Sequence, residues 1–239
     1  MIETMSDRMK EVAASKAVEY VEEGMVVGLG TGSTAEFAIR ALGRRVGDGL
    51  GIVAVPTSLA SAKLGKELGI DILSLEEHPE IDLTIDGADE VDADLNLVKG
   101  LGGALLREKI VAGASSREII IVDPTKIVDR LGTRSPLPVE VIPFGWSLAR
   151  HRLRALGTRP ELRRTRSGPY ETDNGNYILD CHFEHGIADA AETERLINGI
   201  PAVVENGLFV GLTDIVVIGR EDGSCQIMAR PDQTKMAAG

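Results

Sequence analysis

Apolar and polar positions in the first half of the chain follow two alternating spacings. Residues 6–23 carry apolar side chains at helical spacing, which predicts a helix that Gly24 terminates. A short apolar run over residues 25–29 follows and predicts a strand. The same alternation predicts further helices over 33–42, 59–68 and 104–114 and strands over 52–55, 71–73, 83–85 and 118–122. Strands that alternate with helices and are joined by short turns predict a parallel sheet covered on both faces.

The pattern changes after Asp123, where a proline-rich stretch over residues 131–143 is typical of a crossing between domains. The residues that follow predict strands over 139–142, 161–165, 177–183 and 202–205 and helices over 146–156 and 189–198. This βαββαβ order is the split βαβ, ferredoxin-like arrangement, and the turn sequence Asp173-Asn-Gly-Asn supplies the hairpin chemistry that it needs.

Three more short strands are predicted near the C-terminus, over residues 208–210, 213–218 and 226–228. We expect all three to return to the first sheet, which makes the ferredoxin-like part an insertion. The predicted fold class is therefore α/β: a Rossmann-like parallel-sheet domain over residues 1–133 and 206–239, with an inserted α+β domain over residues 134–205. Residues 235–239 are expected to fray.

The composition is that of a globular protein, and its charge narrows the choice of partners. The chain has 239 residues and a mass of 25.5 kDa, with 43% hydrophobic and 26% charged residues, a net charge of −11 and a pI near 4.9. An acidic surface repels polyanions, so nucleic acid and anionic membranes are disfavoured, whereas an anionic small molecule can bind where a site is locally positive. Two cysteines, no apolar leader and no apolar run long enough for a bilayer predict a cytoplasmic protein.

The most informative stretch is 86–109, which combines acidic residues, Lys99 and a glycine cluster directly after the apolar run 81–85. Charged residues and glycines rarely form a hydrophobic core. These residues follow a predicted parallel strand, and open α/β sheets bind ligands at the carboxyl ends of their strands, so a ligand site is expected here. Asp86 and Asp89 are close enough in sequence to face one pocket. Two carboxylates there can bind sugar hydroxyls or, if desolvated, force one of the pair to keep its proton.

Two other interpretations of this stretch stay open. A hard cation is the competing use of the clustered acids Asp86, Asp89, Glu90, Asp92 and Asp94, although the spacing of a calcium loop is absent. Considered by itself, Glu108 is interpreted as a solvent-facing helix residue that pairs with a nearby basic group. The histidines and cysteines show no local metal-ligand spacing, so we expect no bound metal.

A second glycine-rich segment, Gly28-Leu-Gly-Thr-Gly-Ser-Thr, joins a predicted strand to a predicted helix and has the ingredients of a phosphate site. It is not a dinucleotide fingerprint, because Ser33 replaces the third glycine and Pro56-Thr-Ser ends the next strand instead of an acid. It is not a Walker A sequence, because no Lys-Ser or Lys-Thr pair follows. A purely structural turn is the alternative, but the hydroxyls of Ser33 and Thr34, next to Thr31, favour a cradle for one phosphate.

Four motifs point, in order along the chain, to one family. They are Gly-Thr-Gly-Ser-Thr at 30–34, Asp-Gly-Ala-Asp-Glu at 86–90, Lys-Gly-Leu-Gly-Gly-Ala-Leu-Leu-Arg-Glu-Lys-Ile at 99–110 and Pro-Leu-Pro-Val-Glu-Val-Ile-Pro at 136–143. Together they resemble the type A ribose-5-phosphate isomerases. Further similarity at 172–180 and 199–209 extends the resemblance over essentially the full length.

The resemblance implies a homodimer or homotetramer that interconverts ribose 5-phosphate and ribulose 5-phosphate in the pentose phosphate pathway, with no cofactor. It implies Glu108 as the general base, which moves a proton between C2 and C1 through a cis-enediolate, and Lys99 as the group that stabilises the oxyanion. Asp86 and Asp89 should hold the sugar hydroxyls and help to open the ring. The other implied substrate contacts are Thr31, Gly32, Ser33, Thr34 and Lys10 at the phosphate, and Gly87, Ala88, Gly100, Leu101, Gly102 and Lys126.

One departure from the family pattern is visible: many members have three glycines after the lysine, whereas this chain has Gly100-Leu-Gly, which bears on the backbone contact at Leu101. Acyl-CoA transferases and sugar-phosphate deaminating isomerases of related folds are rivals, but the matching motifs extend into the inserted domain. A sugar-phosphate-sensing regulator would need neither Glu108 nor Lys99 and would normally carry a basic DNA-binding domain, which this sequence does not show.

Overall fold

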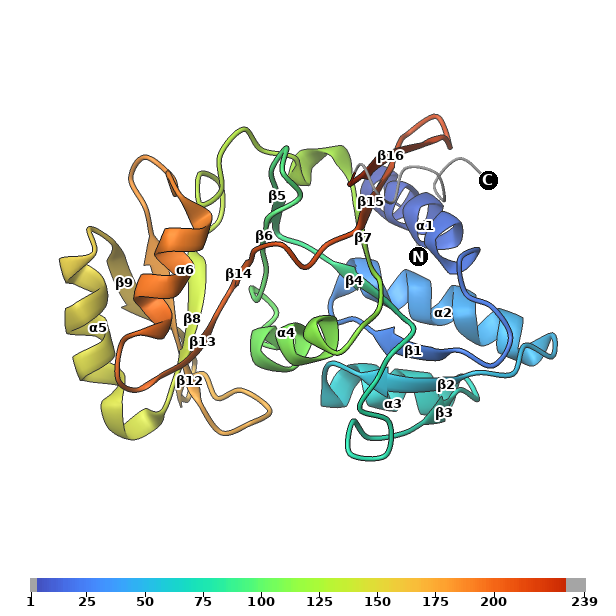
Figure 1. Ribbon diagram of the computed structural model, residues 1–239, viewed down its shortest axis with the longest axis horizontal. Helices are drawn as coiled ribbons and strands as arrows, with labels where there is room; N and C mark the ends of the chain where they lie inside the picture. Colours follow the sequence, from blue (N-terminus) through green and yellow to red (C-terminus); the bar gives the residue numbers. More distant parts are fainter. Residues whose placement is uncertain (1–3, 231–239) are drawn as a thin grey trace. The chain divides into compact units, whose positions relative to one another are not determined.

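The computed structural model describes residues 4–230 and divides the chain into two compact units (Figure 1). The first unit contains Met1–Ala88, Arg107–Lys126 and Leu212–Gly239, and the second contains Asp89–Leu106 and Ile127–Gly211. The second unit therefore begins earlier than the predicted insertion at residue 134. The expectation for residues 235–239 lies outside the described residues.

A seven-stranded sheet forms the centre of the first unit, in the order β16-β15-β7-β4-β1-β2-β3. Its strands are β1 (Val26–Leu29), β2 (Val53–Pro56), β3 (Asp71–Ile72), β4 (Leu83–Gly87), β7 (Glu118–Val122), β15 (Ile215–Gly219) and β16 (Cys225–Ala229). All neighbouring strands are parallel except β15 and β16. The Rossmann-like sheet is thus confirmed, and its strand order reverses at β1 and β4, the kind of position where open α/β sheets bind ligands.

Helices cover both faces of this sheet. They are α1 (Met5–Val18), α2 (Ser33–Gly47), α3 (Leu59–Glu67) and α4 (Leu105–Gly113). Ala17 of α1 and Ile39 of α2 share one hydrophobic core with Leu29 of β1. Gly28, which precedes Leu29 in β1, faces the opposite side of the sheet. A Cβ at Gly28 would lie only 2.8 Å from Val111 of α4. Across residues 4–230, every helix falls short of the length and apolarity that a bilayer crossing requires.

Helix α1 ends five residues before the predicted end at Glu23. The apolar spacing continues into a turn, in which Val21 is buried and its N–H donates to the carbonyl of Val18. The guanidinium of Arg45, on α2, donates to the carbonyls of Val18 and Val21 at 2.5 and 2.9 Å. In a longer helix these carbonyls would accept hydrogen bonds from the N–H groups of the next turn, and here Arg45 satisfies them instead. The helical spacing therefore predicted too long a helix.

The second unit contains the predicted ferredoxin-like arrangement. Its elements in chain order are β8 (Leu137–Val141), α5 (Trp146–Ala155), β9 (Arg159–Leu162), β12 (Tyr177–His182), α6 (Ala190–Asn198) and β13 (Val203–Asn206). The strands form an antiparallel sheet in the order β13-β8-β12-β9. Ala149 and Leu153 of α5 and Ile197 of α6 share one core with the strands, so both helices cover the same face.

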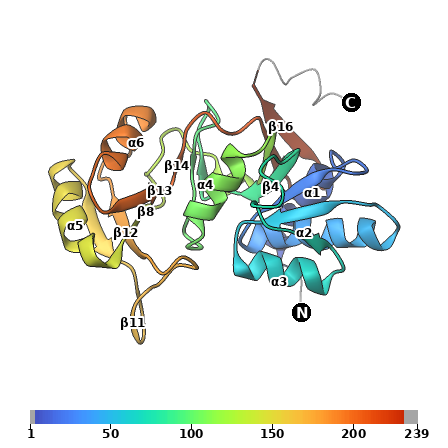
Figure 2. The same ribbon diagram turned by 60° about the horizontal axis from the view of Figure 1, so that its bottom comes forward.

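The predicted strand over 161–165 divides in two. β9 ends at Leu162, and after Arg163 a small hairpin forms from β10 (Arg164–Thr165) and β11 (Gly168–Pro169), visible in Figure 2. Gly168 has φ 155°, close to the limit of the backbone region that favours glycine. The interruption places Arg163 between two strand segments.

A further three-stranded sheet in the second unit corrects one prediction. Its order is β14-β6-β5, from β14 (Leu208–Phe209), β6 (Leu97–Val98) and β5 (Glu90–Val91). The segment 208–210 was expected to join the parallel sheet, but β14 pairs with β6, and only β15 and β16 return. Gly207 permits this pairing, because a Cβ there would lie 2.2 Å from the carbonyl oxygen of Lys99.

Candidate active site

The loop between β1 and α2 forms around the carboxylate of Asp86. A Cβ at Gly30 would lie 2.2 Å from Asp86 Oδ1, so only glycine fits there. The N–H of Thr31 donates to the same oxygen at 3.0 Å, and the N–H of Gly87 donates to it at 2.7 Å. Asp86 is the last but one residue of β4 and has 1% of its surface exposed, so a buried carboxylate organises the start of the loop.

The predicted phosphate residues meet at the N-terminus of α2. Gly32, with φ 104°, is the N-cap, and Ser33 and Thr34 are the first two residues of the helix. The first N–H groups of a helix have no partner within it and carry the positive end of its dipole, which suits an anion. Lys10 of α1 adds a positive charge, because its Nζ donates to Ser33 Oγ at 3.0 Å. Lys10 and residues 31–34 therefore form one cationic cradle.

Thr31 has a different environment from that of its neighbours. Its hydroxyl lies 2.7 Å from that of Thr57, 2.8 Å from Ser58 and 3.1 Å from Ser61. Ser61 Oγ also donates to the carbonyl of Gly30 at 2.6 Å, and Thr57 Oγ1 donates to that of Leu29 at 3.0 Å. We call Thr31, Thr57, Ser58 and Ser61 the hydroxyl cluster. Three of its members were not predicted as site residues, although the sequence Pro56-Thr-Ser after a strand was a visible signal.

Glu108 lies in the first turn of α4 and is 5% exposed. The alternative interpretation, a solvent-facing residue on a helix surface, is therefore wrong. The positive end of the α4 dipole stabilises a negative charge at this position. A buried carboxylate at a helix N-terminus is a suitable general base, because its position is fixed and water is largely excluded from it.

Lys126 follows another strand of the same sheet. It ends the short 3₁₀ helix Pro124–Lys126 directly after β7, and it is half-buried. Its N–H donates to the carbonyl of Asp123 at 3.1 Å. Because β1, β4 and β7 are parallel, the cradle, Asp86 and Lys126 all belong to the carboxyl edge of one sheet.

In the second unit, Lys99 opens a glycine turn over residues 99–103, which we call the lysine turn. Lys99 is only 2% exposed, and its Nζ lies 5.4 Å from the centre of the Phe209 ring. Its N–H donates to the carbonyl of Gly207 at 2.9 Å, which continues the β14–β6 pairing. A buried ammonium over an aromatic face is a strong local source of positive potential.

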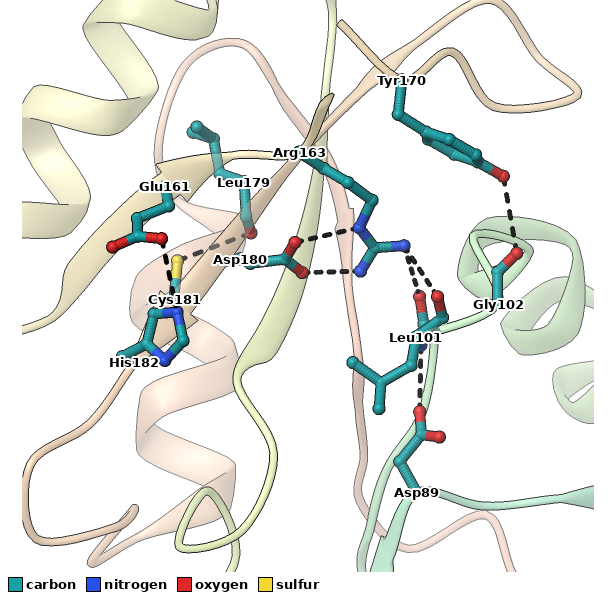
Figure 3. A network of polar contacts seen from close by, with 11 residues as sticks. Asp89, Leu101, Gly102, Glu161, Arg163, Tyr170, Leu179, Asp180, Cys181 and His182 are labelled. Carbon is teal, nitrogen blue, oxygen red and sulfur yellow. Dashed lines mark hydrogen bonds and ion pairs between the residues drawn. The ribbon is translucent and has the colours of Figure 1, made fainter. Parts of the chain in front are cut away.

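Asp89 and Leu101 interact within the second unit, as Figure 3 shows. The N–H of Leu101 donates to Asp89 Oδ2 at 2.9 Å. Leu101 is not among the residues with positive φ, and its side chain is 42% exposed, so a leucine fits at this position of the turn. Gly100, by contrast, has φ 103°, which favours glycine. The departure at Leu101 thus leaves its backbone N–H in use.

Two further acids of the predicted cluster, Glu90 and Asp92, have structural partners. The Glu90 carboxylate accepts from the N–H groups of Gly132, Arg134 and Ser135 at 2.5–2.6 Å. Asp92 accepts from the backbone of Asp94 and from Asn96. Within residues 4–230, no group of three or more His, Cys, Asp or Glu side chains is arranged to hold a metal ion.

Comparison with known proteins gives a consistent result. The family described as ribose 5-phosphate isomerase A (phosphoriboisomerase A) matches residues 53–223. Ribose-5-phosphate isomerase A of Gloeobacter violaceus is 55% identical over 218 residues, which are 91% of this chain and 94% of that protein. The protein of the same name from Roseiflexus castenholzii is 51% identical over 226 residues, which are 93% of this chain and 96% of that protein.

Solved structures agree. A D-ribose-5-phosphate isomerase in complex with phospho-erythronic acid has a TM-score of 0.91 and 41% identity, covering 94% of this chain and 99% of that chain. Ribose 5-phosphate isomerase A from Methanocaldococcus jannaschii has a TM-score of 0.89 and 39% identity, covering 93% and 98%.

The parallel sheet and the buried carboxylates and lysine place the chain among α/β enzymes. Identity near 50% over more than nine-tenths of its length then decides the family. The chain belongs to the ribose-5-phosphate isomerase A family. It is accordingly an aldose–ketose isomerase of carbohydrate metabolism.

Proposed function

We propose that this protein interconverts D-ribose 5-phosphate and D-ribulose 5-phosphate, a step of the non-oxidative pentose phosphate pathway, by metal-independent proton transfer. The observation that carries the proposal is the 55% identity to a ribose-5-phosphate isomerase A over 91% of the chain. The buried positions of Glu108 and Lys99 support the mechanism, because proton abstraction next to a carbonyl needs a fixed base and a fixed positive charge.

The phosphate binds at the cradle of Lys10, Gly32, Ser33 and Thr34, with Thr31 held behind it by the hydroxyl cluster. A phosphate dianion there accepts hydrogen bonds from the first turn of α2. Lys126 adds a further cationic contact. Binding energy from the phosphate, which does not react, helps to orient the carbons that do.

Asp86 and Asp89 hold the sugar hydroxyls and assist ring opening. Asp86 Oδ1 accepts two backbone N–H bonds, which fix the plane of its carboxylate. Asp89 is fixed in the same way by the N–H of Leu101. Carboxylates that are held by backbone donors keep their orientation while their other oxygen acts on a ligand. The backbone of Gly87, Ala88, Gly100 and Gly102 completes the contacts.

Glu108 then takes the proton from C2 of the open-chain aldose. The electron pair of the C–H bond forms a C1=C2 double bond, and the carbonyl electrons move to O1, which gives a cis-enediolate. Lys99 stabilises that oxyanion by its charge. Glu108 returns its proton to C1, while the hydroxyl proton of O2 moves to the neighbouring O1. The C2 carbonyl then forms and O1 becomes a hydroxyl, which yields the ketose.

Phospho-erythronic acid is a natural probe of this scheme, because a related isomerase was solved with it. It is a four-carbon acid phosphate whose carboxylate resembles the charge of the enediolate. We expect it to inhibit this protein competitively and more tightly than ribose 5-phosphate binds.

The finer assignments of partner and place follow the family resemblance. We propose a homodimer or homotetramer in the cytoplasm, with a pentose 5-phosphate as the small-molecule substrate and no nucleic acid, membrane or cofactor. A sugar-phosphate-binding regulator or a CoA-transferase-like enzyme is the alternative. Neither explains why Glu108 and Lys99 are both buried.

The test follows ketopentose formation from ribose 5-phosphate in the presence of a chelator. Wild-type protein should be fully active, and Glu108→Gln should lose about 10²-fold or more in kcat with a smaller change in KM. Glu67→Gln, an exposed carboxylate on α3, is the matched control and should behave as wild type. A strict requirement for a divalent cation, or full activity of Glu108→Gln, would overturn the mechanism.

A further inference from the structure

Arg163, between β9 and β10, sends its guanidinium to the lysine turn (Figure 3). Its Nε and Nη2 donate to the two carboxylate oxygens of Asp180 at 2.9 and 2.6 Å. Its Nη1 donates to the carbonyl oxygens of Gly100 and Leu101 at 3.2 and 3.0 Å. The side chains of Arg163 and Asp180 are only 15% and 18% exposed. One guanidinium therefore joins β12 to two successive carbonyls of the turn.

The Gly100–Leu101 peptide is held at both of its edges. In a trans peptide the C=O and the N–H point in opposite directions. The C=O of Gly100 accepts from Arg163, and the N–H of Leu101 donates to Asp89. A donor on the carbonyl also polarises the N–H, which strengthens its bond to the carboxylate. Figure 3 shows the resulting line of contacts from Asp180 to Asp89.

The Gly100–Leu101 peptide could otherwise change its orientation. Gly100 has φ 103°, and a peptide next to glycine can change orientation at low conformational cost. In the opposite orientation the Gly100 carbonyl would face Asp89 and place an acceptor beside a carboxylate. Arg163 opposes that change, because it would break a charge-assisted hydrogen bond.

We propose that Arg163 is a positioning residue: oriented by Asp180, it fixes the Gly100–Leu101 peptide and, through it, the carboxylate of Asp89. Its effect on the reaction rests on the proposed function, in which Asp89 holds the sugar. Lysine cannot replace it fully, because an ammonium lacks the planar fork that contacts Asp180 and both carbonyls together. Arg163 would have no direct contact with the reacting atoms.

Tyr170 gives the turn a second, weaker support. Its ring lies 5.6 Å from the Arg163 guanidinium, and its hydroxyl donates to the carbonyl of Gly102 at 3.4 Å. The long bond indicates a small contribution. Arg163, whose hydrogen bonds to the turn are shorter and carry a charge, therefore contributes more than Tyr170 to holding the lysine turn.

The test compares full-length variants that separate positioning from stability. Arg163→Met keeps an apolar stem and removes every donor, but it leaves Asp180 without its cation and should lower the melting temperature. Arg163→Met/Asp180→Asn removes that charge as well and should recover the loss. Arg159→Met, on β9, removes only an exposed pair with Glu161 and is the matched control.

The kinetic test compares kcat/KM for ribose 5-phosphate with the inhibition constant of inorganic phosphate. In both Arg163→Met backgrounds kcat/KM for ribose 5-phosphate should fall about 10- to 100-fold, as expected for a small displacement of a binding group. Competitive inhibition by inorganic phosphate, which reaches only the cradle, should be unchanged. Arg163→Lys should lie between Arg163→Met and wild type. Wild-type kcat/KM in the folded double variant overturns the inference, and so does an equal loss of phosphate binding.

Amide hydrogen exchange distinguishes this inference from the proposed function. Exchange over residues 99–103 should be about 10-fold faster in the double variant, as expected for the loss of a charge-assisted bond, and unchanged in Arg159→Met. Unchanged exchange in the double variant overturns the clamp. A wild-type protein without isomerase activity would overturn the proposed function instead, while the exchange result would still decide whether Arg163 holds the turn.

Discussion

The two glycine turns of the protein are stabilised by different chemistry. Apart from the carboxylate of Asp86, which accepts from the N–H of Thr31, the turn after β1 rests on neutral groups, the hydroxyls of Thr31, Thr57, Ser58 and Ser61. The lysine turn rests on charged groups, with Asp89 on one edge of a peptide and Arg163 on the other. Neutral hydrogen bonds contribute about 1 kcal/mol each and can substitute for one another, whereas losing one partner of a buried charged pair leaves the other uncompensated. The lysine turn should therefore be more sensitive to the loss of Arg163 than the turn after β1 is to the loss of one hydroxyl.

Replacing Lys99 gives the largest expected effect. Lys99→Met keeps much of the side-chain volume and removes the buried charge, so kcat should fall about 10²- to 10³-fold, as for other groups that stabilise an oxyanion. Steady-state kinetics measure the loss, and thermal unfolding shows whether the variant is folded. A variant within threefold of wild-type kcat would remove Lys99 from the mechanism.

The equivalent disruption of the other turn is Gly30→Ala. Its Cβ would lie 2.2 Å from the Asp86 carboxylate, so the loop or the carboxylate must move. We expect a loss of about 1–3 kcal/mol in the free energy of unfolding together with a higher KM. Gly47→Ala, on α2 with open space around it, is the control. Equal behaviour of the two alanine variants would mean that the loop is not built around Asp86.

Removing one member of the hydroxyl cluster should have a moderate effect. Ser61→Ala deletes the bond to the Gly30 carbonyl but leaves Thr57 and Ser58 beside Thr31. The expected change is roughly a fivefold rise in KM with kcat nearly constant, which corresponds to the loss of one neutral hydrogen bond. A loss as large as that in Arg163→Met would contradict the contrast between the two turns.

Tyr170→Phe should have the smallest effect, a change of less than about threefold in kcat/KM, because only one long hydrogen bond is lost. Burial raises the pKa of Tyr170, and this outweighs the lowering by Arg163. The hydroxyl therefore keeps its proton, and can donate, to a higher pH than a free tyrosine does. The ratio of wild-type to Tyr170→Phe activity should stay constant through the pH range in which a free tyrosine ionises, and a ratio that falls toward 1 within that range would contradict it.

The sequence was sufficient for the parts of the fold that rest on continuous apolar runs. β7, a run of five buried residues, was predicted at its observed bounds, because such a run has one plausible structure. β5 and β6 were missed because each has only two residues within an acidic, polar stretch. The pairing of β14 with β6 depends on Gly207 approaching Lys99, a long-range contact that no local pattern contains.

The site shows the same limit. Glu108, Lys99 and Asp86 were predicted as site residues by motif, and the structure adds that all three are buried. Arg163 lies in the sequence Leu-Arg-Arg-Thr-Arg, where it looks like one of several surface arginines. Only the register between β9 and β12 brings it beside Asp180, so its role had no signal in the sequence.

The most direct test of the central claim, that the Glu108 carboxylate carries the transferred hydrogen as a proton, is the isomerisation of ribose 5-phosphate in D₂O. Run to equilibrium, repeated turnovers should place solvent deuterium at C1 of ribulose 5-phosphate, because a carboxylic acid proton exchanges with water. Glu108→Gln should incorporate it about 10²-fold more slowly. Ketose that stays free of deuterium at C1, or incorporation by Glu108→Gln at the wild-type rate, would contradict the account.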